Sequence, residues 1–201
     1  MIIPDAIDRA ALKILWRHLG WFRAIQIGLR ITRRQRHGEP FAHLPEAAGF
    51  SETGSRAQAG PAILLYDELK RLGRPDALDI TSECVSQGAL LFLGASIGRI
   101  DREHLASMGD EERRVWLEET TRRFPNATLS VDEASVDRVR FTVSQCRLHG
   151  LTVELGYPEL APLFCRGDAA FFQGEGVRLD RPGTLAEGAS SCPFTLTFET
   201  P

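Results

Sequence analysis

The residue pattern of this chain changes after Pro125, from the 3.6-residue period of helices to the two-residue period of strands. Before that proline, apolar residues recur at helical spacing in several segments. After it, Val139, Phe141 and Val143 alternate with polar residues, as on a strand that buries one face. Helices followed by strands predict an α+β fold, in which a helical N-terminal portion packs on a small antiparallel sheet with an inserted helix.

The first 124 residues are expected to be mainly helical. One long first helix is predicted over residues 5–36, weakened locally by Gly20 and Gly28. Shorter helices are predicted at about 57–72, 76–98, 101–107 and 110–124. The long first helix carries an apolar stripe that suits the core or a dimer interface: Ile7, Ala11, Ile14, Leu15, Phe22, Ile25 and Leu29. Glycine and proline make residues 38–56 a predicted loop.

Residues 125–201 are expected to form the sheet and its inserted helix. The helix is predicted over 158–173, and the strands over 128–131, 136–145, 177–181, 184–187 and 193–199. A length of 201 residues fits one domain, so the helical and sheet portions are expected to share a single α+β domain.

Composition and charge exclude several classes of protein. A formal net charge of −3 gives no overall attraction to nucleic acid. The N-terminus has early acids and lacks the apolar core of a signal peptide. No window approaches the roughly 18 apolar residues of a membrane span, and the longest candidate, Gly88 to Gly98, is too short. We therefore expect a cytoplasmic protein with reduced thiols and with neither nucleic acid nor membrane among its partners.

Three of the four cysteines fall in the last third of the chain. Cys165 and Asp168 are three residues apart on the predicted 158–173 helix and so share one face. The alternative is a surface aspartate beside a buried cysteine. Cys146 ends a predicted strand, and His149 follows it three residues later, as two metal ligands or a thiol–imidazole pair would. The fourth cysteine, Cys84, suits a small buried hydrophobe within a helix.

Whether these thiols meet is left open by the strand pattern. Counted along its strand, Cys146 falls on the polar face, whereas Cys192 falls on the apolar face of the last strand. Both lie at strand ends, where a turn can redirect them. Standard zinc, nucleophile-elbow and dinucleotide-binding motifs are absent.

The order of short motifs over residues 136–198 resembles that of a known family. The motifs are Cys146, Leu155-Gly-Tyr-Pro-Glu-Leu160, Phe164-Cys165-Arg-Gly-Asp168, Arg181 with Thr184-Leu185, Gly188, and Cys192-Pro-Phe194. Together they are similar to those of the L-2-amino-thiazoline-4-carboxylic acid hydrolase family. The resemblance implies hydrolytic opening of a small cyclic amidine at a C–N bond, with no required cofactor.

The resemblance also implies roles for particular residues. The catalytic set would be Cys146, Cys165, Asp168 and Cys192, with Cys165 as the first choice for the nucleophile or a key ligand because it shares a helix face with Asp168. The substrate would be held by Arg181 or Arg140 at its carboxylate, with Thr184 and His149 as further contacts. His149 is also a candidate proton shuttle; its alternative is a solvated position at a helix start.

Two other functions remain open for the same residues. One is a non-catalytic module that binds or senses a small molecule in a cysteine-lined pocket. The other is a metalloprotein, in which Cys146, Cys165, Cys192 and Asp168 would hold zinc or iron. A small molecule is the expected partner in the first case and in the hydrolase, and a homodimer is compatible with all three.

Overall fold

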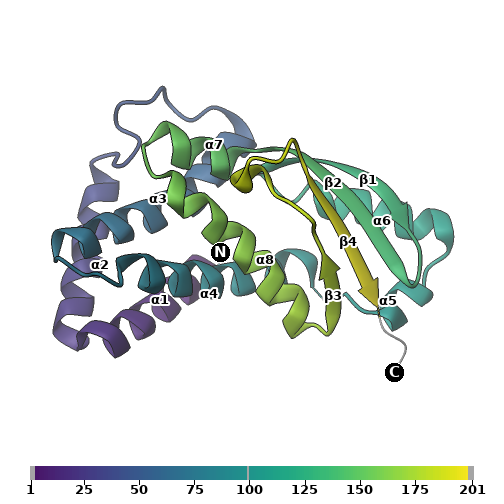
Figure 1. Cartoon of the computed structure of the whole chain (residues 1–201), viewed down its shortest axis with the longest axis horizontal. Coiled ribbons are helices and arrows are strands. Elements are labelled where there is room, and N and C mark those ends of the chain that lie inside the picture. Colours follow the sequence, from purple (N-terminus) through teal and green to yellow (C-terminus); the bar gives the residue numbers. More distant parts are fainter. Residues whose placement is uncertain (1–2, 99, 199–201) are drawn as a thin grey trace.

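The computed structural model describes residues 3–98 and 100–198, with helices at one end and a sheet at the other (Figure 1). The helices are α1 (Ile3–Leu19), α2 (Trp21–Arg36), α3 (Gly49–Arg71), α4 (Ala77–Ile97), α5 (Arg102–Ala106), α6 (Asp110–Thr121), α7 (Arg147–Glu154) and α8 (Ala161–Gly174). The strands are β1 (Ala127–Ala134), β2 (Arg138–Cys146), β3 (Val177–Asp180) and β4 (Cys192–Phe198). The α+β class is confirmed, with a helical N-terminal portion.

The prediction of one helix over residues 5–36 is wrong. The chain breaks at Gly20, whose φ of +79° lies in the left-handed region that side chains with a Cβ rarely adopt. Two helices, α1 and α2, replace the single long one. Because the break rotates the second half relative to the first, Phe22, Ile25 and Leu29 do not continue the buried stripe and are exposed.

Three smaller predictions also differ from the structure. The predicted loop 38–56 is shorter, because α3 already begins at Gly49. The predicted strand 184–187 is a 3₁₀ turn, Leu185–Glu187, closed by Gly188 at φ +89°. Helix α7 was not predicted as a separate element, since its eight residues are too few to show a period.

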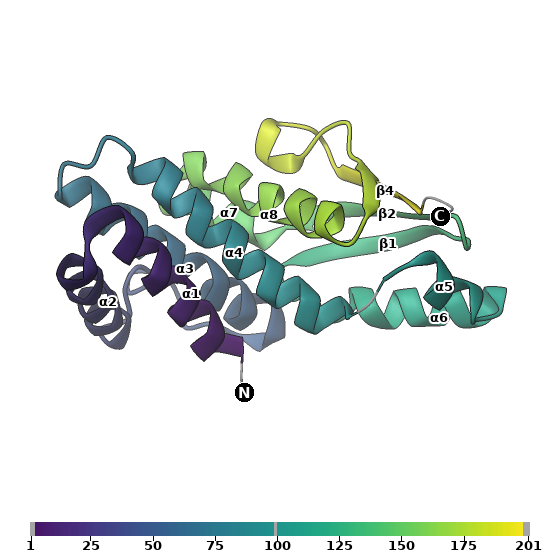
Figure 2. The same ribbon diagram turned by 90° about the horizontal axis from the view of Figure 1, so that it is seen from below.

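The sheet is antiparallel in the order β1-β2-β4-β3. Burial along β4 alternates, and the buried residues Leu196 and Phe198 pack with Val139 of β2 against helices α4, α5, α6 and α8. In Figure 2, α5, α6 and the end of α4 lie below the strands. The other face is open, as expected for an antiparallel sheet covered on one side.

Close contact between α4 and α8 depends on Gly167. A Cβ added at this glycine would lie 2.4 Å from the Cβ of Ala89 on α4, a distance that real Cβ atoms essentially never show. The glycine in the segment Cys165-Arg-Gly-Asp168 therefore lets the helix lie directly on its neighbour, which fixes where Cys165 and Asp168 project.

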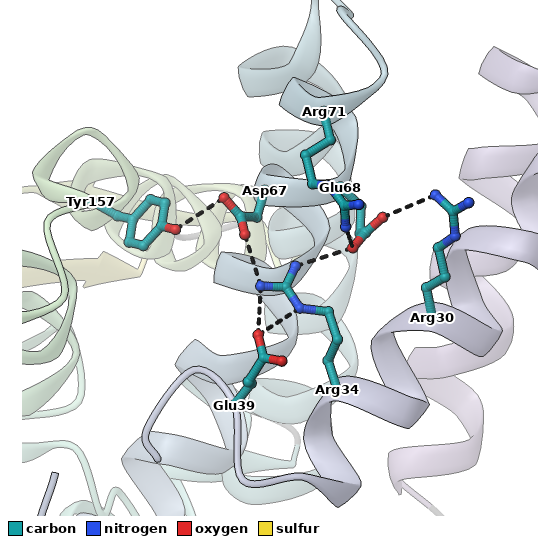
Figure 3. Close-up of polar contacts among 7 residues, drawn as sticks. All are labelled: Arg30, Arg34, Glu39, Asp67, Glu68, Arg71 and Tyr157. Atoms are coloured by element: carbon teal, nitrogen blue, oxygen red, sulfur yellow. Dashed lines mark hydrogen bonds and ion pairs between the residues drawn. The ribbon is translucent and has the colours of Figure 1, made fainter. Parts of the chain in front are cut away.

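A network of charged residues joins the N-terminal helices to the rest of the molecule (Figure 3). Glu68 of α3 is fully buried and accepts hydrogen bonds from Arg34 and Arg71 at 3.1 and 3.0 Å. Arg34 also bonds Asp67, which accepts a hydrogen bond from the hydroxyl of Tyr157 at 3.0 Å. The network therefore connects α2, α3 and the segment that precedes α8.

One segment of the described chain, Ala77–Ala106, is long and apolar enough to cross a membrane by length and composition. The expectation that no segment is long and apolar enough for a membrane span is therefore wrong. The finding is weak by itself, because the core helix of a soluble protein passes the same test. Here α4 packs against α1 and α8.

Candidate functional site

An ion pair between Asp168 and Arg181 lies at the centre of the cysteine-bearing region. Nη1 of Arg181 donates to Oδ2 of Asp168 at 3.1 Å, and Nη2 donates to the backbone carbonyl of Cys165 at 2.8 Å. The guanidinium also lies over the ring of Phe194, 5.0 Å from its centroid. The side chains are 12% exposed for Arg181 and 32% for Asp168. Arg181 is thus held on three sides, and its first partner is Asp168.

Burial changes the protonation of Asp168. Removal from water disfavours the charged carboxylate and raises the pKa of Asp168 to about 6, although Arg181 opposes the rise. A carboxyl group with this pKa is mostly ionised at neutral pH but takes up a proton readily. It therefore has the property required of a general acid or base in a neutral solution.

Cys165 is a neutral thiol in this environment. Burial, and next the charge of Asp168, raise the pKa of Cys165 to about 12, with Arg181 opposing. Cys146, Cys192 and Asp168 all lie close enough to Cys165 that a negative charge on any of them raises the pKa of its thiol. The shared helix face therefore places the carboxylate where it suppresses the thiolate of Cys165.

Cys146 stands at the junction of β2 and α7, as the residue directly before the helix. Burial raises the pKa of its thiol, while the backbone N–H groups of Leu148 and His149 act in the opposite direction. Its sulfur also interacts electrostatically with Cys192 and Asp168. Because β2 ends here and the chain turns into α7, Cys146 packs beside Cys192 and Phe194 despite its place in the strand alternation.

Cys192 and Thr184 both hold the turn between β3 and β4. The backbone N–H of Leu185 donates to Sγ of Cys192 at 3.1 Å. The hydroxyl of the buried Thr184 donates to Oε2 of Glu187 at 2.9 Å. Both polar groups are therefore engaged within the protein, in keeping with a role in shaping this turn.

His149 and Arg140, the other two candidates, differ in position. Nδ1 of His149 is one of two buried side-chain polar atoms in the described residues that have no hydrogen-bond partner. A buried polar atom without a partner is uncommon and marks a position to which a ligand or water can bond. Arg140 is exposed and pairs across the sheet with Thr195, on the open face away from Cys192. The structure therefore separates Arg140 from the cluster.

The four residues proposed as a metal site do not form one in the structure. Across residues 3–98 and 100–198, no three His, Cys, Asp or Glu side chains are arranged to hold a metal ion. Cys84 is buried within α4 and packs in the core, as its sequence context predicts. Burial raises the pKa of its thiol to about 12.

Sequence reasoning gave no role to Phe194 and Glu187. Phe194 supports the guanidinium of Arg181 and stacks on Phe141 at 4.6 Å between ring centroids. Glu187 accepts a hydrogen bond from the hydroxyl of Thr184. Sequence features that could have pointed to both residues were present, since Phe194 ends the last motif and Glu187 follows Thr184 by three residues. The strand alternation by itself, however, predicts only a core position for Phe194.

A pocket of about 490 Å³ opens elsewhere, between the end of α2, the 38–47 segment and α3. Arg56 and Glu39 line it with Phe41, and Arg56 lies over the ring of Phe41 at 5.2 Å from its centroid. None of its lining residues belongs to the cysteine cluster. The cluster is therefore a set of mostly buried groups that this pocket does not reach.

The fold and the cluster define an α+β protein that holds a partly buried carboxylate–arginine pair among three reduced thiols. A family model described as L-2-amino-thiazoline-4-carboxylic acid hydrolase matches residues 54–196. The chain therefore belongs to this family. The match covers the cluster and all of the sheet except the last two residues of β4, whereas α1 and α2 lie outside it.

Other comparisons add little. No curated protein matches the chain. Among solved structures, the chain is similar to a mutant H-NOX protein from S. oneidensis in the Fe(II) ligation state, with 10% sequence identity and a TM-score of 0.39. That similarity covers 96% of this chain and 95% of the other. A TM-score this low supports no conclusion about fold or function.

Proposed function

We propose that this protein is a hydrolase that opens a small cyclic amidine resembling 2-aminothiazoline-4-carboxylate at its ring C–N bond. The family assignment supports the class of reaction. The observation that supports it best in the structure is Asp168, a partly buried carboxyl group with a pKa of about 6 that lies beside a fixed arginine. Such a group meets the two requirements of the reaction, a negative partner and a proton carrier.

The first requirement is recognition of a cation. A protonated amidine is positively charged and more electrophilic at C2 than the neutral form. Oδ2 of Asp168 bonds Arg181, whereas Oδ1 forms no hydrogen bond within the described residues. In the proposed complex, Oδ1 accepts a proton donor of the amidine. Arg181 uses two of its five N–H groups internally and offers the others to the substrate carboxylate.

The second requirement is a nucleophile. A thiol with a pKa of about 12 is ionised to only about one part in 10⁵ at pH 7, so Cys165 is a poor nucleophile. We therefore assign the attack to water. Asp168 removes one proton from water as the water oxygen bonds C2, and returns that proton to the ring nitrogen as the C2–N bond breaks. The remaining hydroxyl proton leaves to the solvent as the carbonyl of the product forms.

The identity of the product shows which ring bond of the substrate is cleaved. Cleavage of C2–N leaves S-carbamoyl cysteine, and cleavage of C2–S would leave N-carbamoyl cysteine. In a covalent route, Cys146 would instead be the nucleophile, and its thiolate would accept hydrogen bonds from the backbone N–H groups of Leu148 and His149. His149, with its unpartnered Nδ1, is the proposed proton acceptor in that case.

The test is steady-state turnover of 2-aminothiazoline-4-carboxylate by the wild type and by Asp168→Asn. We expect Asp168→Asn to lower kcat/KM by about 100-fold or more, because general acid–base catalysis contributes 10²–10⁴-fold. Asp180→Asn is the matched control, since Asp180 is an exposed aspartate at the end of β3. Cys165→Ser is expected to retain most of the activity. Full activity in Asp168→Asn would remove Asp168 from the mechanism.

A binding or sensing module is the second candidate. The observations that favour it are the neutral thiols and the internal engagement of Arg181, Thr184 and Cys192. If the wild type is stabilised thermally by cyclic amidines but consumes none of them, with products followed by mass spectrometry, the binding module replaces the hydrolase.

A further inference from the structure

Helix α2 is apolar on two sides. Ala24 and Ile27 are buried on its inner side. Its outer side carries Trp21, Phe22, Ile25 and Leu29, which we term the outer stripe; Trp21 is 63% exposed, Phe22 70% and Leu29 68%. At spacings of one, four and eight residues, these side chains fall on one side of a helix. The stripe therefore faces away from the core that the inner side packs against.

A stripe of this kind differs from scattered surface hydrophobes. Single exposed apolar residues are normal, but grouped large side chains mark a surface that another body covers. Two aromatic residues lie at the start of the stripe, and their rings meet edge to face at 6.4 Å between centroids. Trp16, at the end of α1, is also exposed. The helix pair thus presents indole and phenyl rings to the solvent.

The charge of α2 is as unusual as its apolar side. The helix carries five arginines and no acidic residue, in a chain whose formal net charge is −3, so the rest of the chain carries −8. Arg30 and Arg34 point inward to Glu68 (Figure 3). Arg23, Arg33 and Arg36 are exposed and form no ion pair with any described residue. These three are available to an external negative charge.

Charge decides between two ways to cover the stripe. A two-fold dimer through α2 would bring together two helices whose charged residues are all arginines, which like-charge repulsion disfavours. The surface of a bilayer that contains anionic lipids offers apolar chains for the rings and negative headgroups for the arginines. An amphipathic helix with Trp, Phe and Leu on one side and arginines beside them is typical of such binding.

We propose that the outer stripe of α2 docks on an anionic lipid surface, with Trp21 and Phe22 in the headgroup region and Arg33 and Arg36 at the lipid phosphates. This replaces the sequence-based expectation that no membrane is among the partners. It concerns a part of the chain outside the family match and is independent of the proposed hydrolase activity.

The test is flotation of the full chain with vesicles of phosphatidylcholine, with or without phosphatidylserine. We expect the protein to float with phosphatidylserine vesicles, to bind phosphatidylcholine alone much more weakly, and to dissociate at high salt. Tryptophan emission should shift to the blue on binding, because Trp16 and Trp21 are two of the three tryptophans.

Variants separate the two contributions. Phe22→Ser with Leu29→Ser is expected to reduce vesicle binding more than tenfold. Arg33→Gln with Arg36→Gln is expected to abolish the preference for phosphatidylserine while leaving a weak apolar component. Phe50→Ser is the matched control, because Phe50 is 66% exposed on α3, outside the stripe, and should leave binding unchanged. Circular dichroism and thermal unfolding verify that each variant is folded.

Three results would overturn the proposal. The first is failure of the wild type to float with phosphatidylserine vesicles. The second is undiminished binding by the folded Phe22→Ser, Leu29→Ser variant. The third is a dimer in analytical ultracentrifugation that this variant abolishes, without vesicle binding by the wild type; the stripe would then belong to an interface between two copies of the chain.

Discussion

At the residue scale, Asp168 carries the chemistry that the cluster can support. Burial raises its pKa and Arg181 limits the rise, so the balance between the two sets the pH at which the carboxyl group changes charge. The same carboxylate keeps Cys165 protonated. In the proposed mechanism, this side chain therefore favours attack by water and disfavours attack by the thiolate of Cys165.

The pH dependence of turnover follows from this balance. As a general base, Asp168 must be ionised, so kcat/KM should rise with pH through about 6 and stay level until the amidine itself loses its proton. In Arg181→Gln the lowering effect of the arginine is lost, so the inflection should move above 6. The measurement is kcat/KM from pH 4 to 9 for both proteins, with thermal unfolding as a check on folding. An inflection that stays near 6 in the variant would show that another group titrates.

At the element scale, two contacts fix the helices that carry the cluster. Gly167 allows α8 to lie against α4, and Arg147 clamps α7 to α3 through Glu52, with Nε of Arg147 2.5 Å from Oε2 of Glu52. Both contacts lie outside the cluster itself. They position Asp168, which lies on α8, and Cys146, which directly precedes α7.

Gly167→Ala is expected to destabilise the protein by about 1–3 kcal/mol, because the new methyl group overlaps Ala89 and must force the helices apart. Gly174→Ala is the matched control on the same helix. A Cβ there meets no atom within 4 Å, so the helix should gain up to about 1 kcal/mol from the better propensity of alanine. Urea unfolding measures both; equal stabilities would contradict the close packing of α8 on α4.

The Glu52–Arg147 ion pair makes the free energy of unfolding depend on pH in the acidic range. The hydrogen bond from Arg147 lowers the pKa of Glu52 from 4.5 to about 2, against the effect of burial. A lowered folded pKa gives stability that is fully present above pH 4.5 and is lost as the pH falls toward 2. The lowered pKa of Glu52 therefore contributes about 3 kcal/mol to the free energy of unfolding at neutral pH. Urea unfolding at several pH values should show a smaller loss over this range for Glu52→Gln than for the wild type.

At the scale of the whole molecule, the network around Glu68 attaches α2 to the part of the chain that the family match covers (Figure 3). Glu68 is fully buried, and a buried carboxylate is stable only while its cationic partners remain. Through Arg34, Asp67 and Tyr157 the same network reaches the segment before α8. The position of α2, with its outer stripe turned to the solvent, therefore depends on this network.

Arg34→Met tests this attachment. Loss of the arginine removes a central partner from Glu68 and Asp67, and we expect about 3–5 kcal/mol of destabilisation. Arg114→Met is the control, because the Arg114–Glu118 pair lies on the surface of α6 and should cost about 1 kcal/mol or less. Chemical denaturation measures both. Equal small losses would show that the network contributes little.

The sequence by itself determined the features that repeat locally. The change of period at Pro125 gave the α+β class, the helical spacing placed Cys165 and Asp168 on one helix, and the order of motifs gave the family. Each depends on residues near one another in the chain, so composition and spacing carry the information.

Only the tertiary structure decided the rest, because it depends on contacts between distant segments. The direction in which α2 faces follows from the left-handed turn at Gly20. Cys146 joins Cys192 because β2 ends and α7 begins at that residue, which strand alternation cannot show. Arg181 pairs with Asp168 from a different element, and burial of that pair sets the pKa on which the proposed chemistry depends.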